Sequence, residues 1–295
     1  MSRFAQFSPY EAQVKSLVNG SLENWPIAAS YISEHIGTDW KPAFTGEPSN
    51  FEEAALSLMP IEVYDNFVKE YNEKQWGIPA RELAASLCRR FDVREDDDPR
   101  LTPRAKYQGI PTAGYAALMR SILDGIPLTL DYDYLQSGGE LRARKLTVFT
   151  GPIDEFFHFD SGRLDYRGQK RTHSYLPDVK EYFQELGQIN NPLHAGGPHI
   201  RTLEWKHMMP QDQALGTRGT VLTKETPFSP TAPDEYEYPM PNATNAQRYS
   251  EYRARADALE GVMICGRLGE YRYYDMDQAV ARAMVLARRI LGSTQ

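Results

Sequence analysis

Four short stretches of this chain hold the residue types that bind rings and anions. Aromatic side chains stack on bases and sugars, and arginine forks bind phosphate oxygens in pairs. A fifth stretch, GRLGEYRYYDMD at 266–277, is a Gly-rich turn between an apolar run and a helical pattern, a place where proteins often hold phosphates. The four are EYNEKQWG (70–77), RRFDVREDDDPR (89–100), GPHIRTLEWKH (197–207) and YEYP (236–239).

Each stretch also has a simpler interpretation. A run of charge such as the one at 96–98 is usually a solvated face, and a single histidine is usually a hydrogen-bonded structural group. Alternation along a strand would place Arg201 on the face opposite Glu204. The chain has 18 tyrosines, many with Arg or Lys close by, which suits sugar and nucleotide surfaces but is equally typical of half-buried packing.

The composition of the chain excludes several classes of protein. Of its 295 residues, 41% are hydrophobic and 25% are charged, as in an ordinary globular protein. No stretch approaches the roughly 20 apolar residues of a membrane span, and the start lacks the apolar centre of a signal peptide, so we expect a cytoplasmic protein without a membrane partner. The net charge of −7 argues against a nucleic-acid partner. Cys88 and Cys265 have no CxxC or His-rich neighbours, which indicates buried thiols rather than zinc ligands or a disulfide.

Hydrophobic periodicity predicts the elements that must position these stretches. Asn19-Gly20 predicts a turn between two short strands. Residues 50–125 show helical spacing, and the period changes at Ile126. From there LTLDYDYL (128–135) and several later apolar runs predict an antiparallel sheet, interrupted by one helix near 178–186.

These patterns predict an α+β fold in which a helical subdomain packs on an antiparallel sheet. The tail is expected to form a helix at 243–259, a strand at 261–266 and a helix from about 275 to 290. The predicted domains are a hairpin with the start of the sheet domain (1–49), a helical substrate-binding subdomain (50–125), an antiparallel sheet domain (126–240) and a C-terminal helix-strand-helix segment with GRLG (241–295).

In their order along the chain, the stretches resemble the motifs of the UDP-galactopyranose mutase family. The resemblance runs from about residue 7 to residue 290, and KQWG and GRLGEYRYYDMD are its most specific parts. It implies an isomerase that interconverts the pyranose and furanose forms of a nucleotide sugar, using reduced FAD whose N5 attacks the anomeric carbon. It also implies a dinucleotide-binding domain, a helical bundle and a twisted antiparallel sheet around a substrate cleft. The other matching stretches are YEAQVKSLVNGSLENWPI, RRFDVRED, YQGIPTAGY, FTGPIDEFF, LDYR, HIRTLEWKH, TKETP and YEYP.

The resemblance further implies roles for single residues. Phe67, Tyr71 and Trp76 would lie against the nucleoside of the substrate. Arg94 and Arg201 would hold the diphosphate and stabilise its charge as the anomeric bond breaks. The remaining implied positions are Tyr236 and Tyr238 in the substrate site, Tyr273 and Asp275 beside sugar and phosphate, and Arg267 and Gly269, which would face the cofactor in a flavin enzyme.

The chain departs from the family pattern where the flavin would bind. Family members carry a strand, a GxGxxG turn and a helix, and VNGS, SGGE and HAGGPH do not supply this fingerprint, so no complete Rossmann domain is expected. The stretch 99–102 replaces an aromatic pair, and TKETP has Lys224 and Thr226 where the family motif has arginine and tyrosine. Three explanations compete: a truncated flavin enzyme, a non-catalytic nucleotide-sugar-binding protein, and a mutase that has abandoned flavin.

The third explanation is favoured, because both Arg94 and Arg201 remain. The chain resembles flavin-independent relatives in nucleoside-antibiotic pathways, which convert a GDP-hexopyranose with a divalent metal in place of flavin. We therefore expect Mg²⁺ or Mn²⁺ as cofactor, no FAD, and GDP- or UDP-galactopyranose as substrate. Arg267 would then be reassigned to packing or to the diphosphate. The candidate metal ligands are Asp96, Asp97 and Asp98.

Ring contraction without flavin needs another chemical route. We hypothesise that the sugar O4 attacks C1 as the diphosphate departs, which forms a bicyclic 1,4-anhydro intermediate. Protonation of the ring oxygen and return of the β-phosphate to C1 would deliver the furanose. His158 and Asp160 are the candidate acid/base groups and His199 is a further one, although a packed structural role is the alternative for His158. A homodimer is expected, because large apolar faces seldom remain bare.

Overall fold

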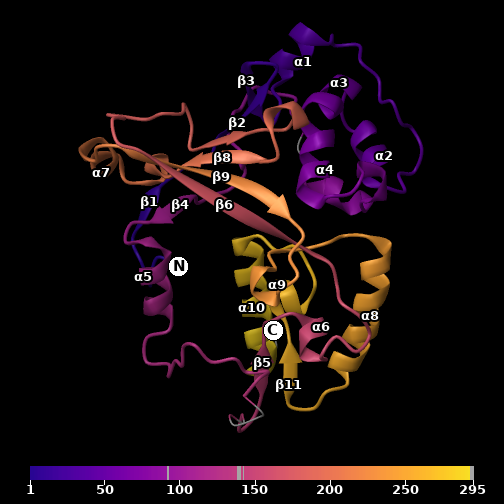
Figure 1. Ribbon diagram of the computed structural model, residues 1–295, viewed down its shortest axis with the longest axis vertical. Coiled ribbons are helices and arrows are strands. Elements are labelled where there is room, and N and C mark those ends of the chain that lie inside the picture. The colour runs from indigo at the N-terminus through magenta and orange to yellow at the C-terminus, as the bar shows by residue number, and fades with distance from the viewer. Residues whose placement is uncertain (92, 138–140, 142, 293–295) are drawn as a thin grey trace. The chain divides into compact units, whose positions relative to one another are not determined.

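The computed structural model describes residues 1–91, 93–137, 141 and 143–292 and separates the chain into two compact units. Unit 1 comprises Met1–Leu128 and Lys170–Pro227, and unit 2 comprises Thr129–Gln169 and Phe228–Gln295. Figure 1 labels the elements of both units. The strands that carry the chain from one unit to the other are β6 (Tyr166–Leu176) and β9 (Thr220–Phe228).

The sheet of unit 1 contains the predicted hairpin. Strand β2 (Val14–Val18) pairs antiparallel with β3 (Ser21–Trp25), and Asn19 and Gly20 turn between them with φ of 50° and 86°. Positive φ at both turn positions is the requirement that Asn-Gly satisfies, so the hairpin prediction is confirmed.

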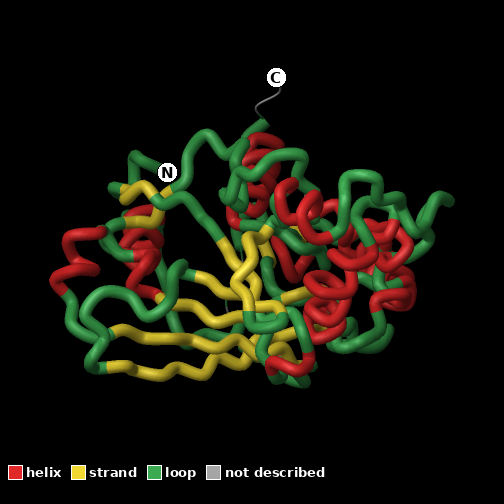
Figure 2. Tube along the Cα trace, turned by 90° about the horizontal axis from the view of Figure 1, so that it is seen from above, coloured by secondary structure: helices red, strands yellow, loops and turns green. Residues whose placement is uncertain are grey.

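The other strands of unit 1 continue this sheet. The complete strand order is β10 (Tyr238–Pro239), β6, β9, β8, β7, β2, β3. Figure 2 shows strands lying side by side in yellow. Strand β7 (Gln188–Asn190) runs parallel to β2, whereas β8 (Arg201–Glu204) pairs antiparallel with both β7 and β9. Strand β1 (Phe7–Pro9) pairs separately with β4 (Gly109–Pro111).

The helices of unit 1 are short, and the π-helical turn packs on this sheet. The ring of Phe67 lies 6.2 Å from the ring of Trp25 on β3, and Phe51 and Val68 are fully buried beside them in the core. The helical prediction for 50–125 therefore holds for most of that range, with a π-helical turn at Tyr64–Lys69 and 3₁₀ turns at Ala80–Glu82 and Ala85–Arg90. The α-helices are α1 (Ala29–His35), α2 (Phe51–Leu56), α3 (Ile61–Val63), α4 (Glu70–Trp76), α5 (Gly114–Ile122) and α7 (Gln211–Gly216), and further 3₁₀ turns lie at His194–Gly196 and Trp205–Met208.

Unit 2 is built on a parallel strand pair, β5 (Thr147–Phe149) and β11 (Val262–Ile264). Its core contains the buried residues Ile153, Tyr166, Tyr252 and Ile264. A short strand, β10 (Tyr238–Pro239), pairs antiparallel with the start of β6. The predicted helix, strand and helix of the tail are confirmed. The helices are α6 (Ile153–Phe156), α8 (Ala243–Asp257), α9 (Gly266–Gly269) and α10 (Met276–Ile290), with a 3₁₀ turn at Pro233–Glu235.

Two predicted elements are wrong. Residues 128–135 form no strand, and Leu128 and Leu130 are exposed, so alternation there does not report a buried face. Residues 178–186 form turns and bends instead of a helix. The fully buried carboxylate of Glu204 accepts hydrogen bonds from the backbone N–H groups of Phe183 and Gln184 at 2.6 to 3.0 Å, which holds this segment in a non-helical path.

The predicted α+β class is confirmed, although β5 belongs to a parallel pair and not to the antiparallel sheet. The four predicted domains stay an interpretation of the sequence. Cys88 and Cys265 are buried and free, as expected. Within the described ranges, no helix combines the length and the apolarity needed to cross a membrane.

Candidate active site

The predicted nucleoside residues of unit 1 lie on the π-helical turn and on α4. Phe67 is 3% exposed and packs edge-on against Tyr31 with 5.6 Å between ring centroids, besides its contact with Trp25. Trp76 is buried as well, whereas Tyr71 is half-buried. The π-helical turn is a feature that recurs at functional sites, because it shifts the facing of the residues that follow it. Phe67 is thus a packing residue of this helix, and Tyr71 is the more accessible aromatic side chain.

Lys74 connects this helix to the segment that leads into β8. Its Nζ is buried and donates hydrogen bonds to the backbone carbonyl oxygens of Asn191, Leu193 and His199 at 2.9, 2.6 and 3.3 Å. Burial lowers the pKa of Lys74 to about 8, and Glu70 opposes that shift. The side chain therefore fixes α4 against residues 191–199, two residues before Arg201.

Arg201 is held by a buried carboxylate. Its Nε donates to Glu225 Oε2 at 2.5 Å, and Arg171 Nε donates to Glu225 Oε1 at 3.2 Å. Glu225 is 3% exposed, and it faces Arg201 directly in the β8–β9 register. Burying a carboxylate requires compensation by charge or hydrogen bonds, and the two guanidinium groups supply it. Glu225 thereby fixes the orientation of the Arg201 guanidinium.

His199 lies beside this pair of elements. It is half-buried, and its Nδ1 is 3.4 Å from the side-chain nitrogen of Asn191. Burial lowers the pKa of His199, and the charges of Lys224 and Lys74 lower it further. The imidazole is therefore neutral at pH 7 and has one ring nitrogen able to accept a proton.

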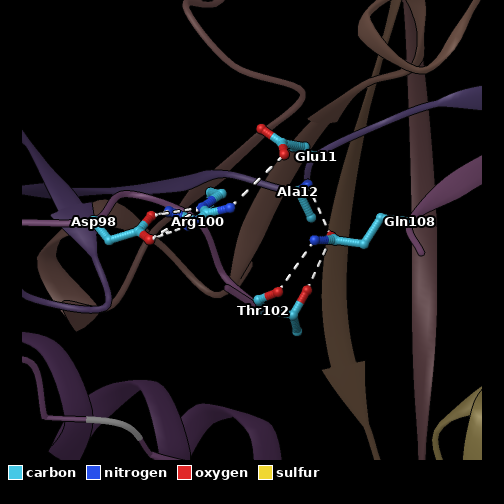
Figure 3. Close-up of polar contacts among 6 residues, drawn as sticks. All are labelled: Glu11, Ala12, Asp98, Arg100, Thr102 and Gln108. Atoms are coloured by element: carbon cyan, nitrogen blue, oxygen red, sulfur yellow. Dashed lines mark hydrogen bonds and ion pairs between the residues drawn. The ribbon is translucent and has the colours of Figure 1, made fainter. Parts of the chain in front are cut away.

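Arg94 is buried at the base of the acidic stretch. Its Nη2 donates to the carbonyl oxygen of Arg100 at 2.9 Å. Arg100 donates hydrogen bonds from Nε and Nη2 to the carboxylate of Asp98 at 2.5 to 3.0 Å. These hydrogen bonds lower the pKa of that carboxyl to about 2. Figure 3 shows this pair beside Glu11, whose Oε1 is 3.9 Å from Arg100 Nη1, and beside the hydrogen bonds that tie Gln108 to Ala12 and Thr102.

The three candidate metal ligands are engaged in different ways. Asp96 Oδ1 accepts from the backbone N–H of Asp98, and Asp97 Oδ1 accepts from the backbone N–H of Ser30. Asp96 and Asp97 are exposed. Among the described residues, no group of three or more His, Cys, Asp or Glu side chains is placed to hold a metal ion. The metal assignment stays a prediction, and it needs donors beyond these side chains.

In unit 2, the guanidinium of Arg267 lies against two tyrosines. Its central carbon is 4.6 Å from the ring centroid of Tyr238 and 4.5 Å from that of Tyr273, and its Nη1 donates to the carbonyl oxygen of Tyr274 at 3.1 Å. Cation–π contacts of this kind are favourable at these distances. Gly269 lies close to Ile264, because a Cβ on it would meet the Ile264 side chain at 3.0 Å. The two residues predicted to face a flavin thus have contacts within the protein.

The other predicted residues of unit 2 are distributed over several contacts. Tyr236 is buried and stacks on Tyr166 with 4.0 Å between ring centroids, and its hydroxyl accepts from Arg163 at 3.3 Å. Asp275 is the N-cap of α10, where its backbone N–H donates to Gln278 Oε1 at 3.0 Å in a capping box. Tyr238 and Tyr273 remain half-buried around Arg267.

Comparison with known proteins identifies the family to which the chain belongs. A family model described as UDP-galactopyranose mutase matches residues 66–273, which is more than half of the chain. The chain belongs to the UDP-galactopyranose mutase family. The match includes every predicted site residue except Asp275, which lies two residues beyond its end.

Individual relatives agree with the family assignment. The chain is 29% identical over 307 residues to a probable UDP-galactopyranose mutase of Klebsiella pneumoniae, covering 99% of this chain and 77% of that protein. It is 25% identical to the dTDP-fucopyranose mutase of Escherichia coli, covering 98% and 79%. A crystal structure of reduced UDP-galactopyranose mutase superposes with a TM-score of 0.76 at 13% identity, covering 100% of this chain and 81% of that one, and confirms the fold. The relatives are named mutases, in agreement with the predicted isomerase class.

The acid/base candidates of unit 2 differ in their surroundings. His158 is exposed and has a φ of 55°, next to Phe159 with a φ of 59°. Asp160 forms two hydrogen bonds with Arg255 at 2.6 and 2.7 Å, and these lower the pKa of its carboxyl. A carboxyl with a lowered pKa is a poor proton donor at neutral pH, so the contacts of Asp160 suit an ion pair. The catalytic roles of both residues stay predictions.

The sequence does not predict the roles of two residues that position the candidate site of this UDP-galactopyranose mutase homologue, Lys74 and Glu225. Lys74 lies inside KQWG, and Glu225 lies inside TKETP, two motifs of the resemblance. Lysine and glutamate are almost never buried unless they are paired, so the sequence favours an exposed position for both. Their partners are distant in sequence, and no local pattern indicates the pairing. Only the pairing of β8 with β9 brings Glu225 to Arg201.

Proposed function

We propose that this chain is a nucleotide-diphosphate-sugar pyranose/furanose mutase that acts on GDP- or UDP-galactopyranose without flavin and with a divalent metal. The observation that carries the proposal is the connection made by Lys74 within unit 1. It joins the helix with Tyr71 and Trp76 to the segment that ends at Arg201. A nucleoside stacked on the helix would thus lie at a fixed distance from the arginine that receives its diphosphate.

Arg201 and Arg94 supply the positive charge for the departing diphosphate. Glu225 orients the Arg201 guanidinium through the hydrogen bond that it accepts from Nε. Charge-assisted contacts of this kind strengthen as the anomeric bond lengthens and charge accumulates on the phosphate oxygens. The arginines therefore favour the transition state over the bound substrate.

A divalent metal fits this site only with donors from the substrate. Mg²⁺ is commonly bound by one or two carboxylates together with substrate phosphates and water, and Asp96 and Asp97 are exposed carboxylates in the stretch that carries Arg94. Asp98 is less suited, because Arg100 already binds both of its oxygens. When bound, the metal would neutralise charge on the diphosphate.

Independence from flavin is supported by the contacts of Arg267 and Gly269. The guanidinium lies against the rings of Tyr238 and Tyr273, whose centroids are 5.3 Å apart, and a Cβ on the glycine would meet Ile264 at 3.0 Å. Both residues have contacts within the chain, whereas Arg267 Nε is buried without a hydrogen-bond partner among the described residues.

The chemical route proposed here moves one proton. As the bond from C1 to the diphosphate oxygen breaks, O4 bonds to C1 and gives its proton to a base. The bicyclic 1,4-anhydro sugar then opens when the β-phosphate oxygen bonds to C1 and the C1–O5 bond breaks, while O5 takes a proton from the conjugate acid. Atoms and charge balance, and the group that accepts the O4 proton can return it to O5.

The pH dependence of turnover identifies the base. His199 has a lowered pKa, so as a base it would stay active down to a pH below its usual value of 6.5, and kcat/KM would fall only as the pH drops through that lower value. We expect His199→Asn to lower kcat/KM on the order of 100-fold and to remove that limb of the profile. His158→Ala is the matched control; a comparable loss in His158→Ala with a normal profile for His199→Asn would assign the base to His158.

A turnover assay separates the mutase from a non-catalytic nucleotide-sugar-binding protein. The purified chain is incubated with GDP- or UDP-galactopyranose and Mg²⁺ or Mn²⁺, and the products are separated by chromatography. The mutase proposal predicts furanose product that disappears with EDTA. Tight binding of either nucleotide sugar, measured by calorimetry, without any product would support the binding protein instead.

A further inference from the structure

The turn between β7 and β8 contains the stretch HAGGPH (194–199), which does not supply a dinucleotide fingerprint. Asn190 at the end of β7 faces Arg201 at the start of β8, and residues 191–200 form the turn between them. The backbone N–H of Asn191 donates to the carbonyl oxygen of Ile200 at 2.7 Å. This bond fixes the two ends of the turn to each other, and His199 lies just inside the closing end.

The side chain of Asn191 lies inside this turn and is almost completely buried. Its Nδ2 donates hydrogen bonds to the carbonyl oxygens of Gly196 and His199 at 3.0 and 2.9 Å. The carbonyl oxygen of Gly197 is 3.4 Å from the same nitrogen, and so is His199 Nδ1. An amide NH₂ group has two hydrogens to donate, and the backbone of the turn accepts both. The amide therefore determines the path of the chain from Gly196 to His199.

Glycine at position 196 allows the amide to occupy the inside of the turn. A Cβ on Gly196 would lie 1.9 Å from Asn191 Oδ1 and 2.7 Å from its Cγ. Atoms that are not bonded do not approach so closely, so a side chain at 196 would displace that of Asn191. Gly197 has a φ of 97°, which glycine adopts without steric cost. Both glycines of HAGGPH are thus explained by the packing of the turn around Asn191.

Helix α4 holds the same turn from outside. The carboxylate of Glu70 accepts a hydrogen bond from the backbone N–H of His194. The carbonyl oxygen of His199 accepts from Asn191 Nδ2 on the inside and from Lys74 Nζ, at 3.3 Å, on the outside. The backbone of His199 is therefore fixed from two sides, while its ring stays half-buried.

We propose that Asn191 is a positioning residue that sets the orientation of the His199 imidazole for proton transfer. The inference rests on the proposed function, because it takes His199 as the base of the mutase reaction. Asn191 acts through the histidine, since it binds the backbone carbonyl of His199 and lies against the ring at Nδ1. A base that is held in place before the reaction needs less reorganisation in the transition state.

A titration of His199 followed by NMR tests the position of the ring without any turnover. The resonance of His199 is assigned by its absence from His199→Asn. In the native chain we expect a pKa below 6.5, because burial and the charges of Lys224 and Lys74 lower it. Asn191→Asp puts a carboxylate oxygen where Nδ2 lies, 3.4 Å from the ring nitrogen, and should raise the pKa of His199 by about 1 or more.

Gln188→Glu is the matched control for the titration. It adds the same charge to β7, three positions before Asn191, and Gln188 donates to Asn190 and not to the turn. This variant should leave the pKa of His199 unchanged. A pKa of His199 that Asn191→Asp also leaves unchanged would overturn the proposal, because the amide would then not lie against the ring.

Steady-state kinetics connects the turn to the reaction. Asn191→Ala should lower kcat about tenfold or more and change KM little, because the base is misplaced after the substrate has bound. Gly196→Ala should have the same effect, and in combination with Asn191→Ala it should add no further loss, because the clash needs the asparagine side chain. Gly216→Ala is the matched control, since no atom lies within 4 Å of a Cβ at that position.

The two measurements separate this inference from the proposed function. A native chain that turns over, with Asn191 variants that keep its kcat and its His199 pKa, would overturn the inference alone. Additive losses in Gly196→Ala and Asn191→Ala would also contradict it, because they would act independently. A native chain without turnover would overturn the proposed function, and with it the role of Asn191 in proton transfer. Circular dichroism of each variant verifies that it is folded.

Discussion

Arg201→Ala is expected to lower kcat/KM for the nucleotide sugar on the order of 100-fold or more, about 3 kcal/mol of transition-state stabilisation. The reason is the charge that develops on the diphosphate as it leaves C1, which a fixed guanidinium fork stabilises better than mobile water does. Arg201→Lys should recover only part of the loss, because an ammonium keeps the charge without the bidentate geometry. Steady-state kinetics on the purified variants gives both values.

Arg171→Ala is the matched control for this experiment. Arg171 shares the buried Glu225 carboxylate with Arg201, so its removal disturbs the same ion pair. It should change kcat/KM only a few-fold, because Arg201 still compensates Glu225. Equal losses in Arg171→Ala and Arg201→Ala would mean that compensation of Glu225, and not contact with the diphosphate, is what the enzyme needs.

Lys74→Met is expected to lower the free energy of unfolding by roughly 1 to 3 kcal/mol. The methionine fills a similar volume but leaves the carbonyl oxygens of Asn191, Leu193 and His199 without their shared donor. Leu193 O keeps the Gly196 N–H as a donor and His199 O keeps Asn191 Nδ2, so the main loss is at Asn191 O. A buried acceptor that loses its partner costs about 1 to 3 kcal/mol. Urea denaturation followed by fluorescence measures the change.

The same variant should raise KM more than it lowers kcat. Lys74 is a positioning residue, since it fixes the helix that carries Tyr71 and Trp76 without contacting the reacting atoms. Lys69→Met is a control on the neighbouring turn, and Lys69 is only half-buried. A Lys74→Met chain as stable as Lys69→Met, with an unchanged KM, would contradict the role given to Lys74.

Local signals in the sequence predict the secondary structure best where the chain supplies its own turn or cap chemistry. Asn19 and Gly20 both adopt the positive φ that a two-residue hairpin turn needs. Helix α10 begins at a capping box, in which the side chains of Asp275 and Gln278 accept hydrogen bonds from backbone N–H groups of the first turn. The helix expected at 178–186 fails for the opposite reason. Its backbone N–H groups bind Glu204, a residue about twenty positions away, and no local pattern reports such a partner.

The same distinction applies to the candidate site. Residue types and their order predict that Tyr71, Trp76, Arg94 and Arg201 bind the substrate. Aromatic rings stack on bases, and guanidinium groups bind phosphate oxygens. The residues that orient them are less visible. Glu225 contacts Arg201 because β8 pairs with β9, and the sequence alone does not predict the register of that pairing.

The central claim, a family member that works without flavin, is tested most directly by turnover of the flavin-free protein. The purified chain is stripped of any bound flavin, its absorbance between about 350 and 500 nm is recorded, and GDP- or UDP-galactopyranose is added with Mn²⁺. We expect furanose product at full rate from colourless protein, with no increase when FAD and dithionite are added. Product that forms only after reduced FAD is supplied would contradict it.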